Sequence, residues 1–312
     1  SSANMYNTAV GSSAGEAVTT GTENTLIGGA AGDALTTSNG NTALGRLALS
    51  AETTSNGNTA IGAEALKNQN VGGSGDARNT AVGLLAGANV STGISNTIIG
   101  ALAGDALTDA DYNVAIGKSA LSTDTLGSRS TAIGFAALET QNFTSATNTY
   151  NTAVGHGAGN QVTTGTGNTF VGGLAGDGTD DGANNVAVGR EALSGNAGND
   201  NVAIGYESMS AATGSTNTCV GQTTGMVITG LNNACFGVSA GRGITSGNNN
   251  ITIGRNAGRT GSPGGNITTG SNELALGDEN IASASIQVDW TVASDQRDKT
   301  DFTALDLGLD FV

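Results

Sequence analysis

The chain of 312 residues contains 51 glycines and one proline, and aromatic residues make up only 4% of it. So few large side chains exclude a thick globular core, while a hydrophobic fraction of 37% is too high for a solvated disordered chain. With a formal net charge of −15, the surface would repel polyanions, so we expect no nucleic-acid partner. No apolar run is long enough to cross a bilayer, so we expect no membrane insertion.

One short phrase, Asn-Thr-Ala-(Val/Ile)-Gly-x-x-Ala, recurs along the chain and defines a repeat. Most copies follow one another after sixteen or seventeen residues, and three spacings are longer by four to six residues. Sixteen copies in register exclude a flexible glycine-rich linker, whose residues would not need to keep their spacing. The glycine of the phrase, called the repeat glycine below, stands at positions 11, 28, 45, 62, 83, 100, 117, 134, 155, 172, 189, 205, 221, 237, 254 and 277.

Each phrase predicts a short strand, because β-branched residues alternate with small ones between turn-forming residues. The residue before the repeat glycine is large and apolar in all sixteen copies, the residue two before is Ala in ten, and the residue four before is Asn in fourteen. One strand face therefore carries Thr and Val or Ile, and the other carries Asn, Ala and Gly. We expect the small face to line a narrow two-layer roll and the branched face to be covered by two more copies of the chain.

These observations predict an all-β fold, a parallel β-solenoid of about sixteen turns that assembles as a homotrimer. At roughly 4.8 Å per strand, sixteen turns would stack into a rod of about 75 Å.

A longer period of four turns is superimposed on the single-turn repeat. Four residues after the repeat glycine, two turns with Gly alternate with two turns with a large residue as far as Met209, and the last turns, with Gly225, Gly241 and Gly258, lose this superperiod. At the same four-turn interval, Leu26, Ile98 and Phe170 replace the usual Ala of the strand. Duplication history and a structural reason explain this superperiod equally well.

Two connections are four residues longer than the others, so residues 67–78 and 139–150 should protrude from the rod. Phe135, Phe143 and Tyr150 lie in or beside the second of these long turns. Exposed rings are common in sugar-binding surfaces, and we take these three as candidate residues for binding a host surface glycan or protein. The alternative, that each ring folds over its own turn, stays open.

Other candidate sites have simpler interpretations. His156 is the only histidine and has no second ligand nearby in sequence, so it is expected to be a solvated turn residue. Cys219 and Cys235 occupy the Ala position of adjacent turns, where stacked side chains point the same way and suit a disulfide poorly, so we expect buried free thiols. Residues 72–76 and 177–182 lack the ligand ladder of a calcium loop. We expect no metal, no cofactor and, without a glycosidase-like carboxylate pair, no enzyme activity in the repeats.

The repeat phrase over residues 7–277 resembles the head repeats of trimeric bacterial adhesins, which form left-handed parallel β-rolls, and the repetitive shafts of bacteriophage tail fibres. This resemblance implies an extracellular trimer with a structural or adhesive role. The usual adhesin turn is shorter than the turn of this chain.

The C-terminal residues 290–311 resemble the opening of the intramolecular chaperone domain of endosialidase-type phage tail spikes and fibres. In that family the domain drives trimerisation and then cuts itself free, using a serine nucleophile and a lysine base five residues later. The resemblance implies that Ser294 is the nucleophile and Lys299 the base, with Asp295 and Arg297 as further motif residues. Such a lysine must be neutral, which burial at a subunit interface favours.

Because the chain stops at Val312, before most of such a domain, we expect a truncated form that does not process itself. The predicted organisation is a repetitive shaft over 1–277, a capping and linker segment over 278–293, and the start of the chaperone domain over 294–312. The favoured function is a virion tail-fibre segment that extends toward a host receptor. The head of a bacterial trimeric adhesin and part of a polysaccharide-degrading tail spike are the alternatives.

Overall fold

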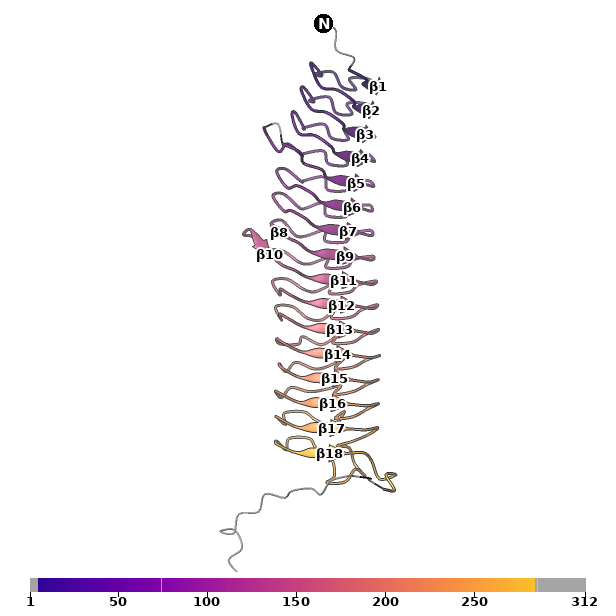
Figure 1. The fold of residues 1–312 in the computed structure, drawn as a ribbon, viewed down its shortest axis with the longest axis vertical. Coiled ribbons are helices and arrows are strands. Elements are labelled where there is room, and N and C mark those ends of the chain that lie inside the picture. The colour runs from indigo at the N-terminus through magenta and orange to yellow at the C-terminus, as the bar shows by residue number, and fades with distance from the viewer. Residues whose placement is uncertain (1–4, 74, 284, 286–312) are drawn as a thin grey trace, which may run out of the picture. The chain divides into compact units, whose positions relative to one another are not determined.

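The structure is a computed structural model that describes residues 5–73, 75–283 and 285. These residues contain short strands joined by turns and no helix. The chain divides into two units, Ser1–Glu279 and Asn280–Val312, and the first of them contains all the described strands. Figure 1 shows this first unit as a rod of stacked turns.

Sixteen strands of three residues form one parallel sheet that runs the length of the rod, and every strand pairs with the strand of the next turn. The predicted parallel β-solenoid is therefore confirmed. A second, two-stranded parallel sheet is formed by β8 (Gly127–Ser128) and β10 (Thr147–Asn148). The strands of the long sheet are β1 (Thr8–Val10), β2 (Thr25–Ile27), β3 (Thr42–Leu44), β4 (Thr59–Ile61), β5 (Thr80–Val82), β6 (Thr97–Ile99), β7 (Val114–Ile116), β9 (Thr131–Ile133), β11 (Thr152–Val154), β12 (Thr169–Val171), β13 (Val186–Val188), β14 (Val202–Ile204), β15 (Thr218–Val220), β16 (Ala234–Phe236), β17 (Ile251–Ile253) and β18 (Leu274–Leu276).

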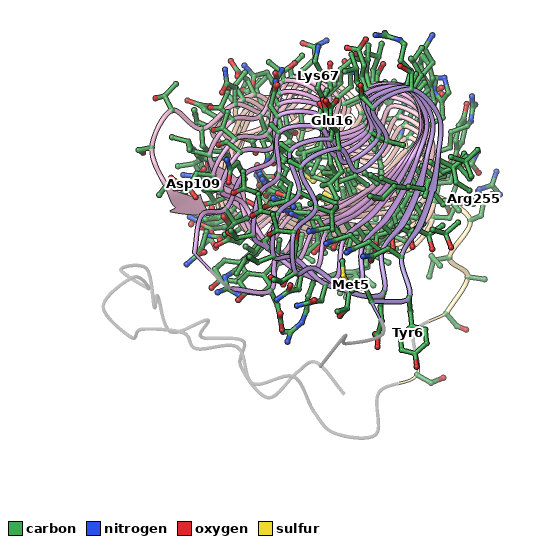
Figure 2. All side chains as sticks on the ribbon, turned by 90° about the horizontal axis from the view of Figure 1, so that it is seen from above. Met5, Tyr6, Glu16, Lys67, Asp109 and Arg255 are labelled. Atoms are coloured by element: carbon green, nitrogen blue, oxygen red, sulfur yellow. The ribbon has the colours of Figure 1, made fainter. Side chains whose placement is uncertain are left out.

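The register of the sheet is the register of the repeated phrase. In β3 and β4, for example, Ala43 lies beside Ala60. Figure 2, which looks down the rod, shows Glu16 and Lys67 at one edge, and both residues stand five positions after a repeat glycine. Residues at equivalent positions of different turns therefore form columns along the rod.

The repeat glycine is required by the close approach of successive turns. Gly28 has a φ of +134°, and a Cβ atom placed on it would lie 2.6 Å from the carbonyl oxygen of Gly45 in the next turn. An L-residue would be strained there and would also collide with the neighbouring backbone. This explains why all sixteen turns keep Gly at this position.

The two strand faces divide as expected between the interior and the surface. Ala43 and Ala60, two residues before their repeat glycines, are completely buried, whereas Val188 and Ile204, one residue before theirs, are 37% and 38% exposed. The small face therefore lines the core, and the branched face lies on the outside of the single chain.

Buried asparagines connect the turns in a ladder. The backbone N–H of Asn41 donates to Oδ1 of Asn24 at 3.0 Å, and Nδ2 of Asn41 donates to the carbonyl oxygen of Ser55 at 3.2 Å. Bonds of the first kind link consecutive turns from Asn7 to Glu273, with one interruption after Ser130. Each buried amide is thus satisfied by its neighbours, as a low-dielectric interior demands.

Packing gives the four-turn superperiod a structural reason. The large side chain of Phe170 fills the space beside two glycines, because a Cβ atom on Gly176 would lie 2.5 Å from its ring and one on Gly159 would lie 2.9 Å from it. Leu26 lies against Gly32 in the same way, with 2.8 Å to such a Cβ atom. A large residue on the strand is therefore matched by glycines on the opposite wall, and this compensation keeps the packing dense.

Candidate binding surface at the second long turn

The first long turn is held to the core by a buried carboxylate. One oxygen of Glu52, Oε1, accepts hydrogen bonds from the three backbone N–H groups of 53–55, at 2.8–3.0 Å. The other oxygen, Oε2, accepts from Nε2 of Gln69 at 3.2 Å and from the backbone N–H of Val71 at 3.4 Å. Gln69 in turn accepts from Nδ2 of Asn79 at 2.9 Å, which joins this anchor to the asparagine ladder.

The second long turn has an equivalent anchor four turns later. Oδ1 of Asp124 accepts from the backbone N–H groups of Gly127 and Phe143, both at 3.0 Å, and Oδ2 accepts from Nε2 of Gln141 at 2.6 Å. Oε1 of Gln141 accepts from Nδ2 of Asn151 at 2.9 Å. The Phe143 amide belongs to the long turn itself, so Asp124 fixes the base of this turn.

The two carboxylates differ in their proton affinity. For Glu52, burial raises the pKa, but hydrogen bonds from Ser55, Thr54 and Gln69 outweigh it, so the net pKa lies below the ordinary glutamate value. For Asp124, burial outweighs the hydrogen bonds and raises the pKa above the ordinary aspartate value. The anchor of the first long turn therefore holds its negative charge more firmly.

Sequence reasoning missed these anchors, although a signal was present. They stand seven residues after a repeat glycine, in the turns that carry or precede a long connection. Aligning that column would have shown Glu52, Gln69, Asp124 and Gln141, together with Thr179 and Asn196, as polar residues at a position that is apolar in eight other turns. The apolar residues of this column are Val18, Leu35, Val90, Leu107, Val162, Ala212, Ile228 and Ile244.

Both long turns project from the same side of the rod. In Figure 1 the connection between β4 and β5 extends beyond its neighbours, and the small sheet of β8 and β10 stands out on that side four turns further on. In the second long turn, Thr147 and Asn148 pair with Gly127 and Ser128 of the preceding turn. The second long turn thus forms a ledge supported by backbone pairing and by the Asp124 anchor.

The three aromatic residues taken from the sequence do not lie together. Phe143 is only 7% exposed and so offers no surface to a ligand. Phe135 is exposed and stacks on His156, with 5.1 Å between the ring centroids, and the ammonium of Lys118 lies 6.0 Å from its ring. Tyr150 is 61% exposed at the end of the ledge. Of the three, Tyr150 alone offers a free ring beside the long turn.

Two residues that sequence reasoning did not select accompany Tyr150. Tyr112 and Arg129 hold the same position as Tyr150, five residues before the repeat glycine, in the two preceding turns. The guanidinium carbon of Arg129 lies 4.8 Å from the ring centroid of Tyr112, and its Nε donates to Oδ1 of Asn148 at 3.0 Å. The ledge therefore carries a cation between two exposed tyrosines.

The cysteines are buried and free, as the sequence predicts, and Cys219 lies directly beside Cys235 in neighbouring strands. The hydrogen bond to Cys235 and burial raise the pKa of the Cys219 thiol, which keeps it protonated and unreactive.

No group of three or more His, Cys, Asp or Glu side chains capable of holding a metal ion is found within residues 5–73, 75–283 and 285. In the same part of the chain, no helix is long and apolar enough to cross a membrane.

A shallow pocket lies near the C-terminal end of the shaft. It is lined by Arg242, Gly243, Arg259, Thr260 and Asn266. Arg259 donates from Nη1 to Oδ1 of Asn256 at 2.8 Å, and neither of the two arginines is in an ion pair among the described residues. Two guanidinium groups with neighbouring polar side chains have the chemistry that suits an anionic group.

The motif residues Ser294, Asp295, Arg297 and Lys299 lie outside the described residues. Comparison with known proteins found no protein-family model that matches the chain and no curated protein that matches it. What is established is therefore the fold, an all-β parallel solenoid built from a fibre-like repeat.

Proposed function

We propose that the chain is the shaft of a homotrimeric extracellular fibre, a phage tail-fibre segment that extends toward a host cell surface. The observation that carries this proposal is the apolar stripe, defined as the residues directly before the repeat glycines. These residues are Val10, Ile27, Leu44, Ile61, Val82, Ile99, Ile116, Ile133, Val154, Val171, Val188, Ile204, Val220, Phe236, Ile253 and Leu276.

The length of the stripe supports assembly with further copies of the chain. It carries one large apolar residue per strand, and at about 4.8 Å per strand its sixteen residues form a row about 75 Å long. Nine of these residues are exposed in the single chain and the other seven are half-buried. Contiguous exposed apolar surface is typical of protein–protein interaction sites. The stripe runs continuously from β1 to β18, so another straight rod can match it along its whole length.

The oligomer is tested by mass measurement with light scattering at micromolar concentration. We expect a particle of about three times the chain mass of 30.3 kDa. Ile204→Asp places a charge in the stripe and should shift the mass toward that of one chain, because burying an unpaired charge is strongly unfavourable. Ala211→Asp is the matched control, since Ala211 is exposed outside the stripe. A wild-type particle with the mass of one chain would refute the trimer.

The choice of a tail fibre over a bacterial adhesin head is supported by the C-terminal motif with Ser294 and Lys299. The complete product of the gene should be cut next to Ser294, and Ser294→Ala should leave it uncut. Cleavage that persists in Ser294→Ala would remove this support and leave the adhesin head as the better assignment.

The ledge at the second long turn supports a role in adhesion. It presents the exposed side chains of Tyr150 and Arg129 on an anchored loop. The fibre should adhere to host cells, and a fibre that adheres to no cell or glycan would restrict the proposed function to a structural one.

A further inference from the structure

We propose that Tyr112, Arg129 and Tyr150 form a binding site for one acidic sugar, a pyranose that carries a carboxylate. This inference rests on the proposed role in adhesion and assigns its place and chemistry. The three residues stand at the same position of three consecutive turns, and successive turns rise by about 4.8 Å. Their side chains therefore form a short column beside the ledge, at a spacing that one sugar ring can span.

The backbone at this position makes large side chains unfavourable, so their presence needs a reason. The φ angles of Tyr112, Arg129 and Tyr150 are 58°, 67° and 52°, in the left-handed region that favours Gly and Asn. The rings of both tyrosines are exposed and so contribute little to the core. A positive φ alone does not mark a site, because the residue at this position has a positive φ throughout the solenoid. What distinguishes Tyr112, Arg129 and Tyr150 is that three large, exposed side chains follow one another in consecutive turns. In the other turns the same position holds Tyr6, Glu23, Gly40, Gly57, Arg78, Ser95, Gly167, Asn184, Asp200, Thr216, Asn232, Asn249 and Asn272.

The positive charge of Arg129 is not neutralised by a carboxylate. None of the ion pairs among the described residues includes it, and its side-chain partner is the neutral amide of Asn148. The acidic residues of the neighbouring turn accept hydrogen bonds from the turn that precedes it. Asp109 accepts from Oγ1 of Thr92 at 2.6 Å, and Asp111 accepts from the backbone N–H of Ile94 at 2.8 Å.

The donors of Arg129 that Asn148 does not use are available to an external acceptor.

The first long turn provides an internal comparison, because it has the same kind of anchor but displays different side chains. Gly40 and Gly57 stand four turns before Tyr112 and Arg129, at the equivalent positions of the first block. The third position holds Arg78, which pairs with Asp76 at 2.5 Å. Asp76 corresponds to Asn148 of the second long turn. The first long turn therefore has no ring at these positions, and its cation is neutralised.

The chemistry of the column selects the ligand class. A guanidinium group binds a carboxylate through two parallel hydrogen bonds, and tyrosine rings offer an apolar face with a polar tip. A surface with a net charge of −15 repels long polyanions. A ligand with one carboxylate on a ring that has apolar C–H faces fits both conditions, and an acidic sugar has this combination.

The test is isothermal titration calorimetry with oligosaccharides that end in glucuronic or N-acetylneuraminic acid, with glucose- and galactose-terminated analogues for comparison. We expect the acidic sugars to bind and the neutral ones to bind at least about tenfold more weakly. Arg129→Gln should weaken acidic-sugar binding by a similar factor. Asn148→Asp supplies the carboxylate present in the first long turn and should have the same effect without removing a side chain. Arg78→Gln is the matched control and should change nothing.

Circular dichroism and thermal unfolding confirm that each variant is folded. The proposal would be overturned if Arg129→Gln or Asn148→Asp bound the acidic sugar as tightly as the unchanged chain. It would also be overturned if acidic sugars did not bind, if neutral sugars bound equally well, or if an acidic peptide bound more tightly. Failure of the site is distinguishable from failure of the proposed function. If the Arg129→Gln variant is still trimeric and still adheres to cells, the proposed function stands and this site does not.

A transfer of the column to the first long turn tests sufficiency. A variant that carries the column at both long turns should bind two acidic sugars per chain in place of one. It combines Gly40→Tyr, Gly57→Arg, Asp76→Asn and Arg78→Tyr. Nothing lies within 4 Å of a Cβ atom placed on Gly40, and the φ of Gly57, +71°, is close to that of Arg129. An unchanged stoichiometry in the folded variant would show that these positions do not constitute the site.

Discussion

The asparagine ladder makes a quantitative prediction for Asn96→Ala. Oδ1 of Asn96 accepts from the backbone N–H of Asn113 at 2.9 Å, and its Nδ2 donates to the carbonyl oxygen of Ala110 at 2.7 Å. Both partners are buried, so the substitution leaves one donor and one acceptor unsatisfied. At about 1–3 kcal/mol for each such group, the local free energy of unfolding should fall by roughly 2–6 kcal/mol.

Hydrogen exchange is the appropriate assay, because turns of a solenoid contact only their neighbours and do not unfold as one two-state unit. Protection of the Asn113 amide should fall at least about thirtyfold, which corresponds to about 2 kcal/mol.

Asn89→Ala is the matched control. Asn89 is exposed and accepts a single side-chain hydrogen bond, from Nδ2 of Asn68 at 3.0 Å, so its substitution should cost less than about 0.5 kcal/mol. Equal loss of protection in the two variants would refute the structural role of the ladder.

Three further predictions concern the core and the anchors. Gly28→Ala should lower the local free energy of unfolding by more than about 1 kcal/mol, measured by hydrogen exchange of the amides in its own and the next turn, because its φ is positive and the next turn leaves no room. Phe170→Ala should cost about 3–5 kcal/mol in the same assay, since the side chain is fully buried against glycines that cannot fill the cavity. Because the pKa of Glu52 is lowered on folding, its stabilising contribution is present above the ordinary glutamate pKa and is lost as pH falls through the folded value. The raised pKa of Asp124 has the opposite sign, so its contribution is present at low pH and is lost as pH rises through the folded value. The measurement is hydrogen exchange of the loop amides bonded to the two carboxylates, corrected for intrinsic pH dependence. On acidification the two sets of exchange rates should change in opposite directions. Changes in the same direction would contradict these assignments.

The sequence was sufficient to predict the strands, their register and their inner face, because each position of the phrase is sampled sixteen times. Ala43 or Asn41 taken alone predicts nothing, but their columns do, since the same residue type recurs there in ten and fourteen of the sixteen turns.

The site was harder to predict because it lies where the repetition is broken. Phe143 was a candidate ring, but its burial depends on Asp124 drawing the backbone of the long turn inward. Arg129 and Tyr112 belong to turns of ordinary length, so nothing in the inserted residues points to them. The proximity of Arg129 to Asn148 follows from the pairing of β8 with β10, which two-residue strands do not reveal in sequence.

Because a buried carboxylate anchors each long turn, the number of turns in the rod and the side chains exposed on its long turns can change separately. Each of the first three four-turn blocks has its own matched core and its own ladder asparagines, and the first two also have an anchored loop. A duplication of one four-turn block would lengthen the shaft by about 19 Å without disturbing any contact in the neighbouring blocks. The long turns can meanwhile change their exposed side chains while Glu52 or Asp124 continues to hold the backbone. A solenoid built in this way can change its length and the side chains of its long turns independently, with the same buried hydrogen bonds supporting both.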